Sequence, residues 1–292
     1  MRTFLILTVD GVTSGFIYAM VALALVMIWR ATRVINYAQG AMAMFTTYVA
    51  LFAIQHRVTY WLAFVIALGA GFVFGAGVER LLVRPIEGRA PLNMVILTLG
   101  LLILLEAVAP MLFGGDVKSF PAPFSRIDIT AGATQLYVSP FDIFVIAAAL
   151  LVMLLLLVFF QRTTIGLRMR AAAFRPEIAR LLGIRVGRML TLGWGLAAVL
   201  GALAGVLIAP GIFLYPNNMD EALVFGFTGA ILGGLDSPVG AVTGAIVVGL
   251  VLSYVGGYLG SDLETVGGLV MLIAVLMVRP QGLFAFHRQR QA

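Results

Sequence analysis

The sequence predicts an all-α polytopic membrane protein that forms a single transmembrane domain over residues 1–292. Apolar residues make up 62% of the chain and charged residues 11%, against about 45–50% and about 25% in soluble domains. The apolar residues form continuous runs of helical length, too long for the strands of a membrane barrel. The stretches between the runs are too short for a separate soluble domain. This composition excludes a soluble enzyme, a disordered chain and a disulfide-stapled secreted domain.

Several kinds of chemistry are excluded by residue type. The chain has no Cys, and its two His residues are His56 and His287. A disulfide framework, a thiolate nucleophile and a multi-His metal centre are therefore ruled out. The sequence also contains no G-x-x-x-x-G-K-[ST] loop for binding ATP. We expect a protein that is not an enzyme and carries no cofactor.

Apolar runs mark the candidate membrane helices, each needing about 17–25 residues to cross the hydrocarbon. Two runs are irregular: one opens on polar residues, and another is short and lies between acidic residues. We therefore expect eight or nine spans, with one or two short or broken helices. The candidate segments are residues 12–29, 34–54, 60–82, 92–113, 141–160, 189–213, 222–235, 239–259 and 262–278.

The positive residues predict the orientation of the chain in a bacterial inner or plasma membrane. Alternation through nine segments, with the N-terminus outside and the C-terminus cytoplasmic, places 15 of the 19 Lys and Arg residues inside. Cytoplasmic loops of membrane proteins carry this excess. Residues 114–140 then form an external loop, which its Pro and Gly content predicts to be irregular.

Residues 162–188, here named the basic loop, carry seven Arg residues against one acid, Glu177. Pro176 suits the first position of a helix, and Gly183 suits the position just after one. We expect short helices over 164–174 and 176–182. Apolar residues recur at helical spacing along both, which predicts a shared apolar face that needs a partner. These residues are Leu167, Ala171, Phe174, Ile178 and Leu181.

Three interpretations of the basic loop compete. It could contact anionic lipid headgroups at the membrane surface, or it could dock a cytoplasmic protein. Nucleic-acid binding is disfavoured, because no base-stacking aromatic residues are interleaved with the Arg residues. Charge and periodicity leave the first two interpretations open.

Four stretches, taken together, resemble one transporter family. They lie in order along the chain and have the sequences VINYAQG (34–40), RAAAFRPEIARLLGI (170–184), LGGLDSPVGA (232–241) and RPQGLF (279–284). They are similar to the permease subunits of ABC importers for branched-chain amino acids, the LivH type. The sequence departs from the family at Gln39, where His is common, and at Ala41, where an acid is frequent. Phe174 and Arg175 also stand where the family usually has polar residues.

The resemblance implies an importer with several subunits. A second, LivM-type permease would share the translocation path, two cytoplasmic ATPase subunits would drive it, and an extracytoplasmic substrate-binding protein would deliver the amino acid. The helices of the basic loop would couple the permease to an ATPase. The residues implied for coupling are Arg168, Arg170, Ala171, Glu177, Ile178, Arg180, Leu181 and Gly183.

The passage of a zwitterion with an apolar side chain requires polar stations on a mostly apolar wall. Glu106 is the acid that lies well inside a candidate span, although a hydrogen bond between helices would also explain it. Broken helices offer free backbone groups, and glycines spaced by four residues also suit close helix packing. The residues expected along the path are Asn36, Gln39, Gly40, Glu106, Gly233, Gly234 and Asp236.

Two alternatives to a branched-chain amino acid permease remain open. A related ABC permease could carry urea, short amides or a sugar. A secondary transporter working alone would need coupling carboxylates in its spans, and Glu106 is the single candidate. Partners expected in every case are membrane lipid and a small-molecule cargo, and no nucleic acid.

Overall fold

The computed structural model describes residues 2–131, 134–135, 137–278 and 282. Apart from Gly282, the resemblance at 279–284 lies outside the described residues. The described chain is nearly all helical, as the composition predicted. A two-stranded antiparallel ribbon interrupts it in the 114–140 segment, where β1 (Thr130–Ala131) pairs with β2 (Thr134–Gln135).

Eleven α-helices lie within the described residues. Six of them are long and apolar enough to cross a membrane, namely α1, α3, α4, α5, α8 and α10, and α3 is continued as far as Ile86 by the short helices η1 and η2. The bounds are α1 Arg2–Thr32, α2 Gln39–Gln55, α3 Tyr60–Val78, η1 (a π-helix) Glu79–Val83, η2 (a 3-10 helix) Arg84–Ile86, α4 Pro91–Phe113, α5 Pro140–Arg162, α6 Thr164–Phe174, α7 Pro176–Leu181, α8 Val186–Ile212, α9 Asp220–Gly233, α10 Pro238–Leu259 and α11 Asp262–Val278.

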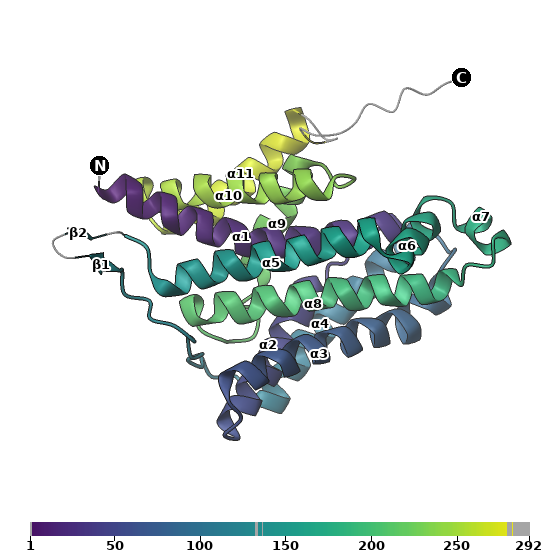
Figure 1. The fold of residues 1–292 in the computed structure, drawn as a ribbon, viewed down its shortest axis with the longest axis horizontal. Helices are drawn as coiled ribbons and strands as arrows, with labels where there is room; N and C mark the ends of the chain where they lie inside the picture. The colour runs from purple at the N-terminus through teal and green to yellow at the C-terminus, as the bar shows by residue number, and fades with distance from the viewer. Residues whose placement is uncertain (1, 132–133, 136, 279–281, 283–292) are drawn as a thin grey trace.

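Two of the long helices, α1 and α8, form the centre of the bundle. Most of each is buried, whereas α4 and α5 expose most of their apolar side chains. Figure 1 shows α5 and α8 running alongside α1, with α10 and α11 on one side and α3 and α4 on the other. A helix that is apolar all round is stable when protein or lipid surrounds it. The exposed apolar residues of α4 and α5 therefore suit a lipid-facing position.

Two helix starts differ from those expected. The first helix begins at Arg2 rather than near residue 12, because no Pro or Gly precedes Gly11 to end it early. In the 34–54 segment, residues 33–38 are not helical and α2 begins at Gln39. Gln39 Nε2 donates to the carbonyl oxygen of Ala197, near the middle of α8, at 3.0 Å. The non-helical stretch therefore runs from the end of α1 into the centre of the bundle.

The two helices expected in the basic loop are present, the second one residue shorter than predicted. Thr163 caps α6 by accepting a hydrogen bond from the backbone N–H of Gly166 at 3.0 Å. Pro176 begins α7, and Gly183 follows it with a φ of +77°. A side chain is strained at that angle, so glycine suits the end of α7.

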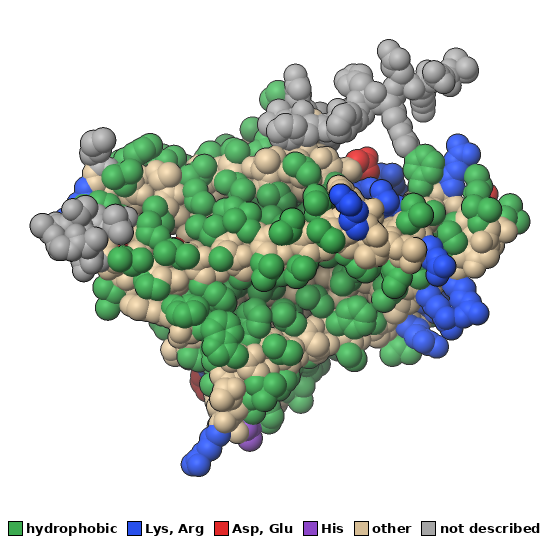
Figure 2. Space-filling view, viewed as in Figure 1, with side chains coloured by type: hydrophobic (Ala, Val, Ile, Leu, Met, Phe, Trp, Pro, Cys, Tyr) green, Lys and Arg blue, Asp and Glu red, His purple; other side chains and the backbone are tan. Residues whose placement is uncertain are grey.

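Basic side chains gather at one end of the bundle. In Figure 2 they cluster at the right, over the end where Figure 1 labels α6 and α7. The start of α1 and the β1–β2 ribbon lie at the opposite end. The charge asymmetry inferred from the sequence therefore corresponds to two ends of one helical bundle.

Candidate translocation path and basic loop

Asn36 and Gln39 lie at the centre of the bundle, with exposed fractions of 0% and 1%. Asn36 Nδ2 donates to Gln39 Oε1 at 3.2 Å, and Asn36 Oδ1 accepts from the backbone N–H of Ala38 at 3.1 Å. Buried amides are costly unless hydrogen-bonded. In this conformation the two amide side chains hydrogen bond to groups of the protein itself and stabilise the non-helical stretch before α2.

The start of α2 meets the start of α9. A methyl group at Gly40 would lie 3.2 Å from the carbonyl oxygen of Met219 and 3.3 Å from Cβ of Leu223. The N-terminal ends of these two short helices therefore approach each other inside the bundle. Unpaired backbone N–H groups and a positive dipole end are found at helix N-termini, and both favour a carboxylate.

Glu106 of α4 and Asp220, the first residue of α9, have neighbouring carboxyl groups. Both side chains are partly buried. Two carboxyl groups can share a hydrogen bond when one of them is protonated. The pair lies between α4 and the start of α9.

Gly233 and Gly234 lie at the other end of α9, away from Asn36 and Gln39. A methyl group at Gly233 would lie 1.8 Å from the carbonyl oxygen of Gly240. A methyl group at Gly244 would lie 2.3 Å from the carbonyl oxygen of Gly229. The two glycine pairs let the backbones of α9 and α10 touch, as small residues do between membrane helices.

We expect Gly233→Ala to destabilise the bundle by about 1–3 kcal/mol, because the added methyl group forces α9 from α10. Thermal unfolding of the purified chain measures this change. Gly77→Ala is the matched control, since a methyl group there meets nothing within 4 Å. Equal stability of the two variants would contradict the close contact.

Asp236 follows α9 and is exposed rather than buried along a path. Its Oδ1 lies 2.5 Å from Nη1 of Arg33, just past the end of α1, and the two side chains are 69% and 60% exposed. The residues expected along the path therefore separate into two groups. Asn36, Gln39 and Gly40 lie at the centre with the Glu106–Asp220 pair beside α9, and Gly233, Gly234 and Asp236 lie near the end of α1.

Sequence reasoning missed a polar pocket of about 280 Å³ between α1, α8, α9 and α11. Glu221 and Glu264 line it together with Tyr18 and Asn218. Thr265 Oγ1 donates to Glu221 Oε1 at 2.8 Å. The pocket approaches the size range of small-ligand sites, about 300–1,000 Å³, and its carboxylates suit a cation such as an ammonium group. Two acids at the starts of apolar segments, Glu221 and Glu264, were the available signal.

The apolar residues expected to share a face of the basic loop are largely exposed. Leu181 is 88% exposed, Phe174 62% and Leu167 59%. The opposite side of these helices is buried, including Met169, Ala172 and Ala179. Four polar residues predicted for coupling are exposed: Arg168, Arg170, Glu177 and Arg180. Gly183 is also exposed, whereas Ala171 is partly buried.

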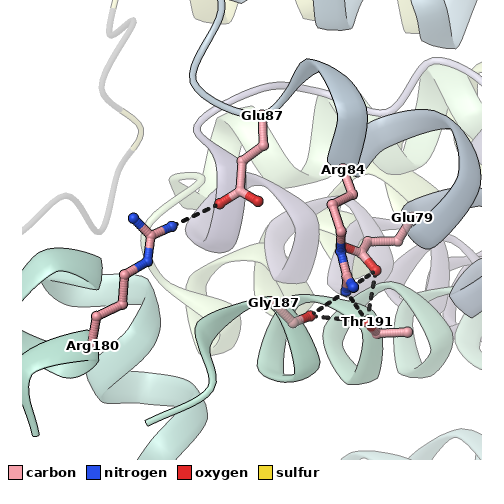
Figure 3. Close-up of polar contacts among 6 residues, drawn as sticks. All are labelled: Glu79, Arg84, Glu87, Arg180, Gly187 and Thr191. Carbon is pink, nitrogen blue, oxygen red and sulfur yellow. Dashed lines mark hydrogen bonds and ion pairs between the residues drawn. The ribbon is translucent and has the colours of Figure 1, made fainter. Parts of the chain in front are cut away.

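A second acid within the bundle forms an ion pair near the end of the 60–82 segment. Glu79 is 0% exposed, and its Oε2 lies 3.0 Å from Nη2 of Arg84 (Figure 3). Arg84 also donates to the carbonyl oxygen of Gly187 at 2.8 Å and to Thr191 Oγ1 at 2.7 Å, both on α8. Thr191 Oγ1 in turn donates to Glu79 at 2.6 Å. The network fastens the end of α3 to the start of α8.

The same region contacts the basic loop. Arg180 Nη2, on α7, lies 3.5 Å from Glu87 Oε1, just past η2 (Figure 3). The chain therefore connects α7 to η2 by this surface pair, and η1 to α8 by the buried pair. A displacement of α7 has a short physical route into the helical bundle.

Comparison with known proteins identifies the family. The sequence model of the family described as branched-chain amino acid transport system / permease component matches residues 7–278. The chain belongs to this family.

Individual permeases agree over nearly the whole length. The permease is 29% identical over 288 residues to the high-affinity branched-chain amino acid transport system permease protein LivH of Salmonella typhimurium and to LivH of Escherichia coli K12. In both cases the match covers 94% of this chain and 93% of the relative. BraD of Pseudomonas aeruginosa, named for the same transport system, is 28% identical, with 94% of each chain covered.

A solved structure supports the fold. A chain of PsaBC from Streptococcus pneumoniae, determined in complex with Fab, superposes on the permease with a TM-score of 0.50 and 14% sequence identity. The superposition covers 95% of the permease and 92% of that chain. At this level of identity the likeness concerns the helical architecture.

Proposed function

We propose that the permease is a translocation subunit of an ABC importer for leucine, isoleucine and valine. The observation that carries the proposal is the family match from residue 7 to residue 278, together with relatives named as permeases for these amino acids. A second, LivM-type permease completes the path, two ATPase subunits supply the energy, and an extracytoplasmic binding protein delivers the cargo. The sequence supports an external energy source, since it carries no P-loop lysine motif.

Cargo enters from the side of the polar pocket. An amino acid carries an ammonium group, a carboxylate and, in this class, an apolar side chain. Glu221 and Glu264 offer the ammonium group its first contact, and the Glu106–Asp220 pair offers a deeper one. The start of α2, which has no acid in its first turn, suits the carboxylate. Asn36 and Gln39 then act as stations when the path opens and their mutual hydrogen bond is exchanged for cargo.

The basic loop couples the permease to an ATPase. Its outer side presents Phe174, Ile178 and Leu181 to solvent next to several Arg side chains. An apolar ridge with a polar rim is the pattern of a docking surface. Movement of α7 reaches α3 and α8 through Arg180, Glu87 and the Glu79–Arg84 network.

We further propose nine crossings, with the N-terminus outside and the C-terminus cytoplasmic. The short helix α9 has 14 residues and spans about 21 Å at 1.5 Å per residue. Its ends support a crossing inside the protein: Leu214 before it pairs with Lys118 of the 114–140 segment, and Asp236 after it pairs with Arg33. Neighbouring helices cover most of its length, which shields its backbone from lipid.

Single-Cys labelling tests this topology, because the native chain has no Cys. A membrane-impermeant thiol reagent added outside is expected to label Val117→Cys and Tyr215→Cys, but not Arg89→Cys or Arg175→Cys. All four native side chains are exposed. Asp236→Cys should react from the cytoplasmic side. Labelling of this residue from outside would contradict the crossing by α9.

Co-purification tests the assembly. A tagged permease extracted in mild detergent, after expression with its genomic neighbours, should retain one second permease and two ATPase chains. Retention of no P-loop ATPase, with the permease itself correctly folded, would favour the secondary transporter considered above.

A further inference from the structure

A cavity of about 500 Å³ lies apart from the candidate path, between α1, α5, α6, α8 and α10. Its wall is mostly apolar and includes Leu23, Met153, Phe160, Met189 and Val242. A volume of this size lies within the range of small-ligand sites. Val239 and Leu157, at its edge, are 66% and 45% exposed. The cavity is therefore accessible from the surface that faces lipid.

Two guanidinium groups line this apolar cavity, those of Arg30 from α1 and Arg170 from α6. Within the described residues neither guanidinium group forms a hydrogen bond or a salt bridge with another side chain. The neighbouring carboxylate, that of Asp236, is engaged by Arg33 at 2.5 Å. The cavity thus combines an apolar wall with two exposed cations at its edge, of which Arg30 also lies in the field of Asp236.

We propose that the cavity binds an anionic phospholipid, with an acyl chain against the apolar wall and the phosphate between Arg30 and Arg170. Burial of alkyl surface favours binding of the acyl chain, and cations near an anionic membrane surface favour binding of the headgroup. Basic pockets between membrane helices on the cytoplasmic side are suited to such headgroups. The location in the inner leaflet rests on the orientation proposed above.

Two other occupants suit the cavity less well. A branched-chain amino acid is a zwitterion, and in the described part of the chain no Asp or Glu lines this cavity for its ammonium group. An apolar helix of a second permease would fill the volume but would leave both guanidinium groups without an anion. An amphiphilic anion satisfies the wall and the cations together.

The bound lipid has a structural consequence. It would lie between α5 and α10, which both pack on α1, and against Arg170, Ala172 and Ala173 of α6. It would therefore support one of the two helices of the basic loop from the membrane side.

The test measures lipid retained by the full-length permease. The chain is extracted from membranes containing phosphatidylglycerol and phosphatidylcholine, and the bound lipid is measured by mass spectrometry. We expect the wild type to enrich phosphatidylglycerol, and the double variant Arg30→Gln/Arg170→Gln to lose this enrichment about tenfold or more, as removal of two cation contacts predicts. The matched control is Arg168→Gln/Arg175→Gln, which removes two exposed Arg residues of the same loop that do not line the cavity.

A second variant separates the cavity from surface charge. Val242→Phe narrows the cavity and keeps both Arg residues, so it should also lower retention. Equal retention by wild type and the Arg30/Arg170 variant would overturn the proposal, as would an equal loss in the Arg168/Arg175 control. Crosslinking from position 239 to a second permease, with no lipid retained, would show that a protein occupies the cavity. None of these measurements depends on transport, so a failure here is distinguishable from a failure of the proposed function.

Discussion

Replacing Leu181 by aspartate is expected to abolish ATP-coupled uptake while leaving the permease in the membrane. Leu181 is 88% exposed at the end of α7, so the substitution removes no internal packing. In a docked complex the same side chain would be buried against the ATPase, where an unpaired carboxylate is strongly unfavourable. Ile178→Asp, on the same helix, should have the same effect. Uptake by reconstituted complexes and the amount of permease in the membrane are the two measurements.

Arg168→Ala is the control for this prediction. It removes an exposed charge from the basic loop, and such single charges contribute about 0–1 kcal/mol. Its uptake should stay within a few-fold of wild type. Wild-type uptake by Leu181→Asp would exclude docking by this face and leave contact with lipid headgroups as the interpretation of the basic loop.

Arg84→Ala is expected to destabilise the folded permease by about 3–5 kcal/mol, the usual cost of removing one partner of a buried ion pair. The substitution leaves the Glu79 carboxylate with 0% exposure and without its cation. It also removes the donor to the carbonyl oxygen of Gly187. Thermal unfolding in detergent should show a lower midpoint, and adding Glu79→Gln should recover part of it, because the buried charge is then absent.

The surface pair in the same region supplies the matched control. Arg180→Ala breaks the 3.5 Å contact with Glu87, in which the side chains are 59% and 35% exposed. Its effect on stability should stay within about 1 kcal/mol. Similar losses in the Arg84 and Arg180 variants would refute the difference in burial on which the prediction rests.

The basic loop was predictable because local chemistry sets its boundaries. The helix before Pro176 cannot continue through this proline without a break. Gly183 adopts the positive φ that ends the following helix, α7. Long apolar runs likewise predicted most of the long helices. The ends of these helices were less predictable, because a helix extends beyond the apolar run when nothing interrupts it. The first helix extends in this way over Arg2–Gly11, before its apolar run begins.

The Glu79–Arg84 pair shows what sequence spacing could not predict. Residues five apart lie about 140° apart around an α-helix, at 3.6 residues per turn, so the spacing does not indicate a pair. The π-helix at Glu79–Val83 has i→i+5 hydrogen bonds, and this wider turn brings the side chains of Glu79 and Arg84 together. The ion pair of Asp236 was not predictable for a related reason: its partner, Arg33, is 203 positions away in the chain, and such pairing depends on tertiary structure.

The pairing of α9 with α10 was partly foreseeable. Glycines spaced by four residues favoured a packing face on each helix, but the sequence did not specify that Gly233 meets Gly240 and Gly229 meets Gly244. The antiparallel contact fixes those partners. The approach of the starts of α2 and α9 at Gly40 was likewise not predictable from the sequence, because it depends on the tertiary structure.

ATP-dependent uptake of labelled leucine, isoleucine and valine by proteoliposomes is the most direct test of the proposed function. The vesicles contain the permease, its second permease and the two ATPases, with the binding protein added on the external side. We expect import of these amino acids that needs ATP, the binding protein and an intact basic loop, with Leu181→Asp as the inactive control. Import of urea, a short amide or a sugar, with none of the three amino acids transported, would contradict the cargo. Uptake that proceeds without ATPase subunits would contradict the ABC mechanism itself.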